Sequence, residues 1–190
     1  MNSKKFFFVL FAFVGLLLVS CSDEQQSPVT PTDPSSLGKD IIREFTGTEE
    51  PLAITDPGTI TVHNGITMLR NMHQNVAFQV TFSDGGIDIL SGEGDLELNA
   101  NIDVVNGTSF WWGNKTLTPS DPEALGGQFK FTWHGPGTLG PAGWTLTFQE
   151  VGHGEGGALT GIQCFNDILV TASPNLSTWI GDAEGYLKTH

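Results

Sequence analysis

Ten consecutive residues, 95–104, alternate strictly between polar and apolar side chains, and no other feature of the sequence narrows the possible folds as much. Successive side chains of a β-strand point to opposite faces, so this alternation is typical of a strand with one buried and one solvent-facing side. It is the pattern of antiparallel sheets. We expect one series to be buried and the other to face solvent: Leu96, Leu98, Ala100 and Ile102 inside, and Asp95, Glu97, Asn99 and Asn101 outside.

The same period of two recurs along the chain. It covers residues 76–83, 128–134 and 144–149, where the large apolar side chains share one face. Apolar content and turn residues predict further strands, at residues 59–63, 109–118, 158–165, 168–172 and 179–188. Only residues 39–45 favour a helix, a short one, since Ile41, Ile42 and Phe45 would line one side of it.

Glycine, with 24 residues, interrupts these segments repeatedly. Turns account for some of the glycines, but Gly113, Gly156 and Gly161 lie inside strand patterns, where glycine marks a bulge or a sharp coil of the sheet. Eight or nine short strands coiled in this way predict an all-β domain. We expect a single antiparallel β-barrel over residues 39–190, with a β-sandwich as the alternative.

The first twenty residues have the composition of a signal peptide. Lys4 and Lys5 give a positive start, and residues 6–19 form an uncharged apolar run. This run is shorter than the roughly 20 residues that a membrane-spanning helix needs. The sequence thus predicts a signal peptide at residues 1–20 and a tether at residues 21–38. The tether is expected to be disordered because it has few apolar side chains to bury.

The residues at the expected cleavage point, Leu18-Val19-Ser20-Cys21, resemble the lipobox of bacterial lipoproteins. The resemblance implies a diacylglycerol thioether on Cys21, cleavage before it and acylation of the new amino group. Ser22 resembles a residue that permits sorting to the outer membrane, and Asp23-Glu24 resembles the acidic export tag of some Gram-negative lineages. We therefore expect a lipid anchor in the outer membrane, at the periplasmic face or the cell surface.

The mature chain is strongly acidic. Without Lys4 and Lys5 it has six basic and 21 acidic residues, a formal net charge of −15. Phosphate-rich partners would be repelled, which excludes nucleic acid and anionic lipid head groups. The expected membrane contact is the lipid on Cys21, and nothing in the sequence sets an oligomeric state.

No catalytic, metal or cofactor motif stands out. The loop at residues 152–157 lacks the Lys-Ser/Thr of a phosphate-binding loop, and Gly-x-Ser-x-Gly is absent. No two of His63, His73, His134 and His153 have the close spacing of a zinc motif. Cys164 shares strand parity with Ile162, which favours a buried and unreactive thiol. The sequence predicts neither an enzyme nor a bound cofactor or metal.

Glycines and aromatic residues recur together over the last hundred residues. The segments that carry the pattern are 111–113, 126–129, 132–135, 152–161 and 180–185. They resemble a Gly-rich pattern of small bacterial barrels that are similar to allene oxide cyclase and lipocalin-like barrels. The resemblance implies a barrel fold, and no catalytic residue is carried over from it.

Two adjacent tryptophans are the candidate ligand-binding residues. Neighbours in a strand point to opposite faces, so Trp111 and Trp112 cannot both lie in the core. The outward one faces water, a ligand or the covering N-terminal segment. We expect a non-catalytic binding or interaction barrel, in one version with a small apolar ligand inside. The alternatives are a hydrolase or cyclase at the barrel mouth and a surface glycan-binding lipoprotein.

Overall fold

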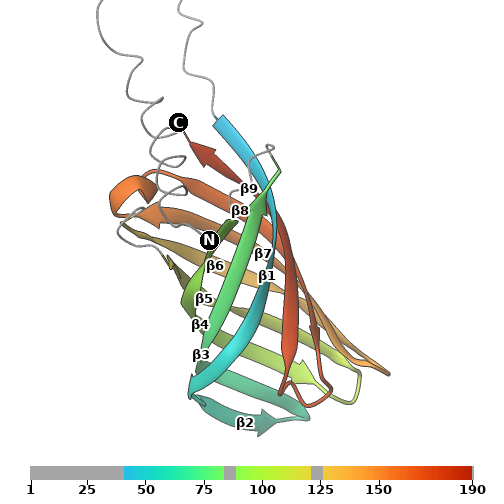
Figure 1. The fold of residues 1–190 in the computed structure, drawn as a ribbon. Coiled ribbons are helices and arrows are strands. Elements are labelled where there is room, and N and C mark those ends of the chain that lie inside the picture. The colour runs from blue at the N-terminus through green and yellow to red at the C-terminus, as the bar shows by residue number, and fades with distance from the viewer. Residues whose placement is uncertain (1–40, 84–88, 121–125, 190) are drawn as a thin grey trace, which may run out of the picture. The chain divides into compact units, whose positions relative to one another are not determined.

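The computed structural model describes residues 41–83, 89–120 and 126–189, which form nine β-strands and one 3₁₀ turn, Gly157–Leu159 (Figure 1). The strands are β1 (Ile41–Asp56), β2 (Thr59–His63), β3 (Ile66–Phe82), β4 (Ile89–Asp103), β5 (Thr108–Pro119), β6 (Gln128–Gly140), β7 (Gly143–Glu155), β8 (Gln163–Ala172) and β9 (Trp179–Thr189). The all-β prediction is confirmed.

Strand β1 closes the barrel because it pairs with β9 along one edge and with β3 along the other. From β3 to β9, each strand pairs antiparallel with the next along the chain. Eight strands thus form a closed antiparallel barrel, and β2 is an extra strand that pairs with β3 outside it. The barrel is confirmed, and the sandwich alternative is wrong.

Strands β1 and β2 follow the same edge of β3 one after the other. The β1 pairing ends at Asp56↔His73, and the β2 pairing begins at Thr59↔Arg70. Between the two, β3 contains a bulge at Asn71, which has a φ of 53° and donates its backbone N–H to Asn99 Oδ1 at 3.0 Å. A two-residue turn with positive φ at both positions, Asn64-Gly65, joins β2 to β3, as a type I′ hairpin requires.

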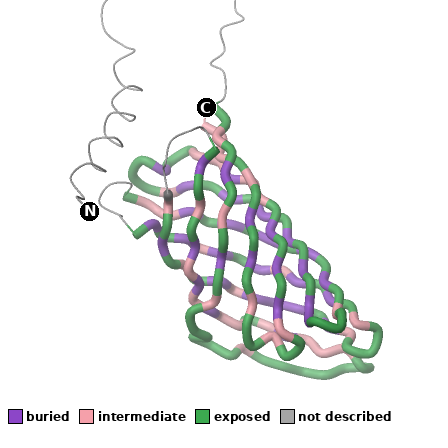
Figure 2. Tube along the Cα trace, turned by 45° about the vertical axis from the view of Figure 1, so that its right-hand side comes forward, coloured by how far each residue is buried: buried purple, intermediate pink, exposed green. Residues whose placement is uncertain are grey.

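Burial alternates along the strands as the sequence predicts, and Figure 2 shows the alternation around the barrel. All four residues of the even series in β4 are buried. The prediction is wrong for Asn99 of the odd series, which was expected to face solvent but is buried. The Asn99 side chain accepts a hydrogen bond from the backbone N–H of Asn71 and donates one to Glu97 Oε1. These two bonds replace the hydrogen bonds that its amide would make to water.

Three local predictions are wrong. Residues 41–45 belong to strand β1 and not to a helix, because pairing with β9 satisfies their backbone and turns Phe45 inward against Phe82. The two strands expected at 158–165 and 168–172 are one strand, β8. Gly156 and Gly161 lie in the loop before it, with φ of 79° and 84°, and do not form bulges.

Gly113 lies in β5 at a close approach and not at a register shift. A Cβ there would come within 2.9 Å of the Trp133 ring.

The predicted signal peptide, the tether and Cys21 lie outside the described residues. Among the residues that are described, no helix is long and apolar enough to cross a membrane.

Candidate functional site

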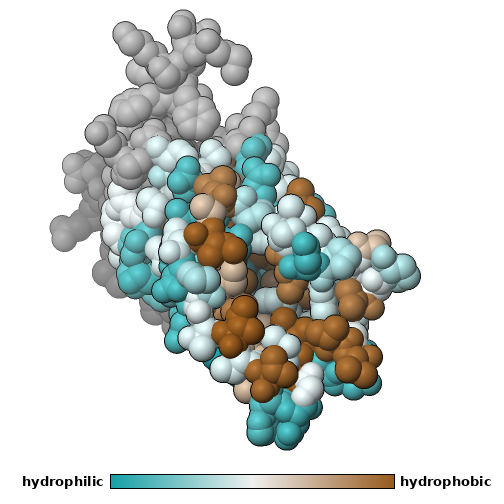
Figure 3. Space-filling model, turned by 90° about the horizontal axis from the view of Figure 1, so that it is seen from below, coloured by the Kyte–Doolittle hydropathy of each residue, from teal (hydrophilic) through white to brown (hydrophobic). Residues whose placement is uncertain are grey.

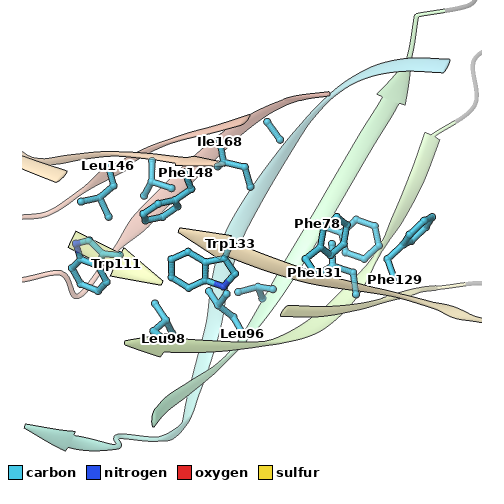
Figure 4. Packing of buried hydrophobic residues seen from close by; sticks show 14 of the residues in the cluster. Phe78, Leu96, Leu98, Trp111, Phe129, Phe131, Trp133, Leu146, Phe148 and Ile168 are labelled. Atoms are coloured by element: carbon cyan, nitrogen blue, oxygen red, sulfur yellow. The ribbon is translucent and has the colours of Figure 1, made fainter. Parts of the chain in front are cut away.

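The inside of the barrel has two parts, which Figure 4 shows as two separate groups of side chains. The first, which we call the closed half, is filled by aromatic side chains from β1, β3 and β6. It leaves a void of only about 40 Å³. Gly152 faces Phe131 there, and a side chain at that position would collide with the ring. The five rings of the closed half are Phe45, Phe78, Phe82, Phe129 and Phe131.

The second part, the open half, surrounds a cavity of about 340 Å³. Side chains from six neighbouring strands, β3 to β8, form its apolar wall, and the Trp133 and Phe148 ring centroids lie 4.8 Å apart within it. Trp179 closes part of the wall by donating to Gln74 Oε1 at 3.2 Å. The main apolar residues of the wall are Leu69, Leu96, Leu98, Trp111, Trp133, Leu146, Phe148, Ile168 and Val170.

The cavity is open because the pairing of β1 with β9 stops early. The last pair is Glu49↔Gly181, although β1 continues to Asp56. The rest of β1 pairs only with β3, which leaves a gap between β1 and the loop that joins β8 to β9. Leu52 and Ile54 line the cavity from one side of this gap, and Leu176 lines it from the other.

Exposed apolar side chains surround this end of the barrel. They come from β1, β2 and the turn between β4 and β5, and Figure 3 shows apolar atoms gathered around a hollow in this view. Contiguous exposed apolar surface marks interaction or ligand-entry sites in soluble domains. We call this set the rim: Leu52, Ile54, Ile60, Val62, Val104 and Val105.

A buried ion cluster separates the two halves. The Lys115 ammonium is fully buried, donates to Glu49 Oε1 and lies 2.9 Å and 2.7 Å from the two carboxylate oxygens of Glu150. The Phe131 ring lies 5.1 Å from Nζ on the closed side. Both carboxylates also line the cavity of the open half. With both ionised, the cluster carries a formal charge of −1.

The pKa values in the cluster follow from burial and mutual charge. Burial raises the pKa of Glu150 to about 7, with a further rise from Glu49, while Lys115 and a hydrogen bond from Asn166 oppose the rise. Burial disfavours the charge on Lys115, but the two carboxylates outweigh it and raise the pKa of the ammonium. Glu150 therefore keeps its proton to a higher pH than an ordinary glutamate, because burial disfavours its charged form.

Three buried side-chain atoms lack a hydrogen-bond partner among the described residues: Trp133 Nε1 and Glu150 Oε2, whose residues line the cavity of the open half, and Asn166 Oδ1, whose residue lines the void of the closed half. The Trp133 indole N–H has none, although only 2% of the residue is exposed. Glu150 Oε2 also has none, because its approach to Lys115 does not have the geometry of a hydrogen bond. Buried polar groups normally have partners, and each exception needs an explanation.

The structure separates the two candidate tryptophans. Trp111 points inward, lines the cavity and donates its indole N–H to Ser109 Oγ at 2.8 Å. Trp112 points outward, where the Arg70 guanidinium covers its ring at 4.9 Å and the exposed Phe110 ring lies 6.1 Å away. Among the described residues, Arg70 of β3 is the one that covers the Trp112 ring.

The histidines and the cysteine lie apart from one another. His73 bonds to Asp95 at 3.0 Å, which raises its pKa, and His153 bonds to Glu155 at 3.0 Å. Cys164 is buried as expected, and burial raises the pKa of its thiol to about 12. The part of the chain that the structure describes contains no group of three or more metal-ligating side chains.

Strand parity could have indicated that Lys115 and Glu150 are buried, although not that they meet. Lys115 falls on the inward parity of Trp111 and Leu117, and Glu150 follows Phe148 at the same spacing. Only apolar residues at this parity were predicted to be buried. A charged residue on an inward parity is itself a signal, since such residues are rarely buried unless paired.

Comparisons of the chain with protein-family models, with curated proteins and with solved structures find no match. The fold and the cavity therefore define the class by themselves: a small antiparallel β-barrel with an internal apolar cavity.

Proposed function

We propose that this chain is a lipid-anchored protein of the bacterial outer membrane, at its periplasmic face or the cell surface. Its barrel, of lipocalin-like kind, binds a small apolar molecule without changing it chemically. The observation that carries the binding proposal is the cavity of about 340 Å³. Its walls are apolar and it opens at the rim. Ligand sites are typically concave, mostly apolar and few in one protein.

The size of the cavity sets the size of the ligand. Water occupies about 30 Å³ per molecule in the liquid, so a ligand that filled the cavity would replace about ten waters. Moving apolar surface from water into this wall supplies the driving force. A compound of one or two fused rings, or a medium-length hydrocarbon chain, matches these limits.

A fluorescent apolar probe tests the proposal. N-phenyl-1-naphthylamine should bind the full chain carrying Cys21→Ala in a saturable way, with increased emission. Ala172 lines the cavity, so Ala172→Phe should abolish this binding. Thr171→Phe is the matched control, because the neighbouring residue faces outward and should leave binding unchanged. Equal binding by both variants, or none by the parent chain, would refute an internal site.

The anchor has its own test, based on the lipobox-like residues that end at Cys21. Mass spectrometry of the full chain produced in a Gram-negative host should find acyl chains on the residue 21 terminus. Cys21→Ala should carry none and should accumulate as precursor or as released protein. Acyl chains on the Cys21→Ala protein would show that the anchor proposal is wrong.

An enzyme that uses the same cavity is the second candidate, favoured by Glu150. A carboxyl with a pKa of about 7 that lines a cavity can act as a general acid or base at neutral pH. A hydrolase or cyclase of this kind should alter a bound apolar compound, and Glu150→Gln should stop the reaction without stopping binding. A bound compound that is recovered unchanged supports the binding function.

The glycan-binding alternative would use the outer face of β5. Phe110 supplies an exposed ring there and Trp112 a half-buried one, and Arg70 occupies one side of Trp112. Trp112→Ala should weaken glycan binding in this case and leave the fluorescent probe bound as before.

A further inference from the structure

Two buried polar atoms without a hydrogen-bond partner belong to paired residues of the cavity wall. Trp133 of β6 and Glu150 of β7 are directly opposite in the strand register, and both residues line the cavity. Directly opposite residues have Cβ atoms about 5 Å apart and interact on the face that they share. The atoms without a hydrogen bond are the indole N–H of Trp133 and Oε2 of Glu150, which has only its ion pair with Lys115 at 2.7 Å. A third such atom, Asn166 Oδ1, belongs to a residue that does not line this cavity.

These atoms are chemically complementary and cannot both be satisfied by a purely apolar ligand. The indole N–H only donates a hydrogen bond, and an ionised carboxylate oxygen only accepts. A hydroxyl group does both at one oxygen atom. We propose that the natural ligand is an apolar alcohol whose hydroxyl accepts a hydrogen bond from Trp133 and donates one to Glu150. This inference rests on the proposed binding function and names the ligand class for the same cavity.

Other polar groups fit the pair less well. An ether oxygen only accepts, so it would satisfy Trp133 and leave Glu150 without a donor. An alkylammonium only donates, and it would place its N–H groups against the indole N–H. A carboxylate would add a negative charge beside Glu49 and Glu150, where Lys115 already offsets only one of two. Of these four groups, only the hydroxyl satisfies both atoms and adds no charge.

A ligand series with one ten-carbon chain tests the inference without any mutation. Decanol, methyl decyl ether, decylamine and decanoate should each be titrated at pH 8 against the full chain carrying Cys21→Ala and loaded with N-phenyl-1-naphthylamine. Decanol should displace the probe at about tenfold lower concentration than the ether, the value expected for one net hydrogen bond. Decylamine and decanoate should be weaker than decanol by at least as much.

Two variants assign this preference to the two residues. Trp133→Phe removes the indole donor and should weaken the binding of decanol about tenfold. The matched control is Trp144→Phe, since Trp144 is buried outside the cavity and its N–H is already bonded to the Pro174 carbonyl, so decanol should bind as before. Glu150→Gln offers the ether oxygen a hydrogen-bond donor. In this variant, the concentrations of decanol and of the ether that displace the probe should therefore differ by no more than about threefold.

The outcomes separate the inference from the binding function. If the probe binds and the ether, amine or carboxylate competes as well as decanol, the alcohol inference is wrong while the binding function stands. If the probe does not bind, both fail. If Trp133→Phe does not fold, the ligand series and Glu150→Gln decide: an undiminished preference for decanol over the ether in Glu150→Gln also overturns the inference.

Discussion

The closed half and the open half are built from the same strands, but they have opposite interiors. In the closed half, β1 pairs on both edges, and five phenylalanine rings leave about 40 Å³ of void. In the open half, β1 has lost its β9 partner, and about 340 Å³ is empty of protein. An eight-stranded barrel is only just wide enough for its side chains to fill. The pairing of one strand therefore decides whether the interior is core or cavity.

The ion cluster lies where the two halves meet. A buried ion pair is weak support for stability, because desolvation of the charges offsets most of their attraction. Its carboxylates face the cavity, and the Phe131 ring faces Lys115 from the closed half. The cluster thus gives the cavity a polar inner end that an aromatic core could not supply.

The largest expected effect comes from breaking this boundary. Lys115→Met leaves two carboxylates buried without their cation, and it should lower the free energy of unfolding by about 3–5 kcal/mol. Urea denaturation measures the loss. Lys130→Met is the control, since that lysine forms an exposed ion pair with Glu155 and should change stability little. Equal effects at both sites would show that the cluster is not the boundary described.

The pH dependence of stability tests the same cluster. Glu150 titrates near 4.5 in the unfolded chain and near 7 in the folded one, so between these values only the folded state holds the proton. Its contribution to stability is complete below about pH 4.5 and is lost as the pH rises to about 7. Between these pH values, the free energy of unfolding should change by about −1.4 kcal/mol per pH unit. The free energy of unfolding of Glu150→Gln should depend less steeply on pH than that of the parent, by this amount. Parallel curves for the two proteins would contradict the raised pKa.

Adding volume compares the two halves directly. Ala183→Leu places a larger side chain in the closed half and should cost about 1–3 kcal/mol through overpacking. Ala172→Leu adds the same volume beside the cavity, where space is available, and should be neutral or stabilising. Thermal unfolding of the two variants gives the comparison. A similar cost at both positions would mean that the open half repacks as tightly as the closed half.

Strand parity predicted most of the fold from the sequence. It gave the barrel, the buried series Leu96 to Ile102 and the opposite directions of Trp111 and Trp112, because a two-residue period depends only on local geometry. It failed at Asn99, whose burial depends on a bulge in β3, and at residues 41–45, where pairing with β9 overrides a helical pattern.

The candidate site was harder to predict than the fold. Glu49, Lys115 and Glu150 come from three distant strands, and only closure of the barrel brings them together. The early end of the β1–β9 pairing, which opens the cavity, has no local signature in the sequence. The part of the site within reach of the sequence was that one of Trp111 and Trp112 points into the barrel; Trp111 is the one that lines the cavity.

The smallest effect concerns the bulge at Asn71, where β3 changes partner from β2 to β1. Its φ of 53° is a left-handed conformation that costs a residue with a side chain about 1–2 kcal/mol, while asparagine and glycine tolerate it best. We expect Asn71→Ala to cost about 1 kcal/mol and Asn71→Gly to stay within about 0.5 kcal/mol of the parent in urea denaturation. Gln79 is the matched control, since it is exposed on the same strand without positive φ, so glycine there should be worse than alanine. The order of the two substitutions must therefore reverse between the positions. If alanine is the better residue at both, the bulge is not held in this conformation, and the change of partner at the start of the open half needs another cause.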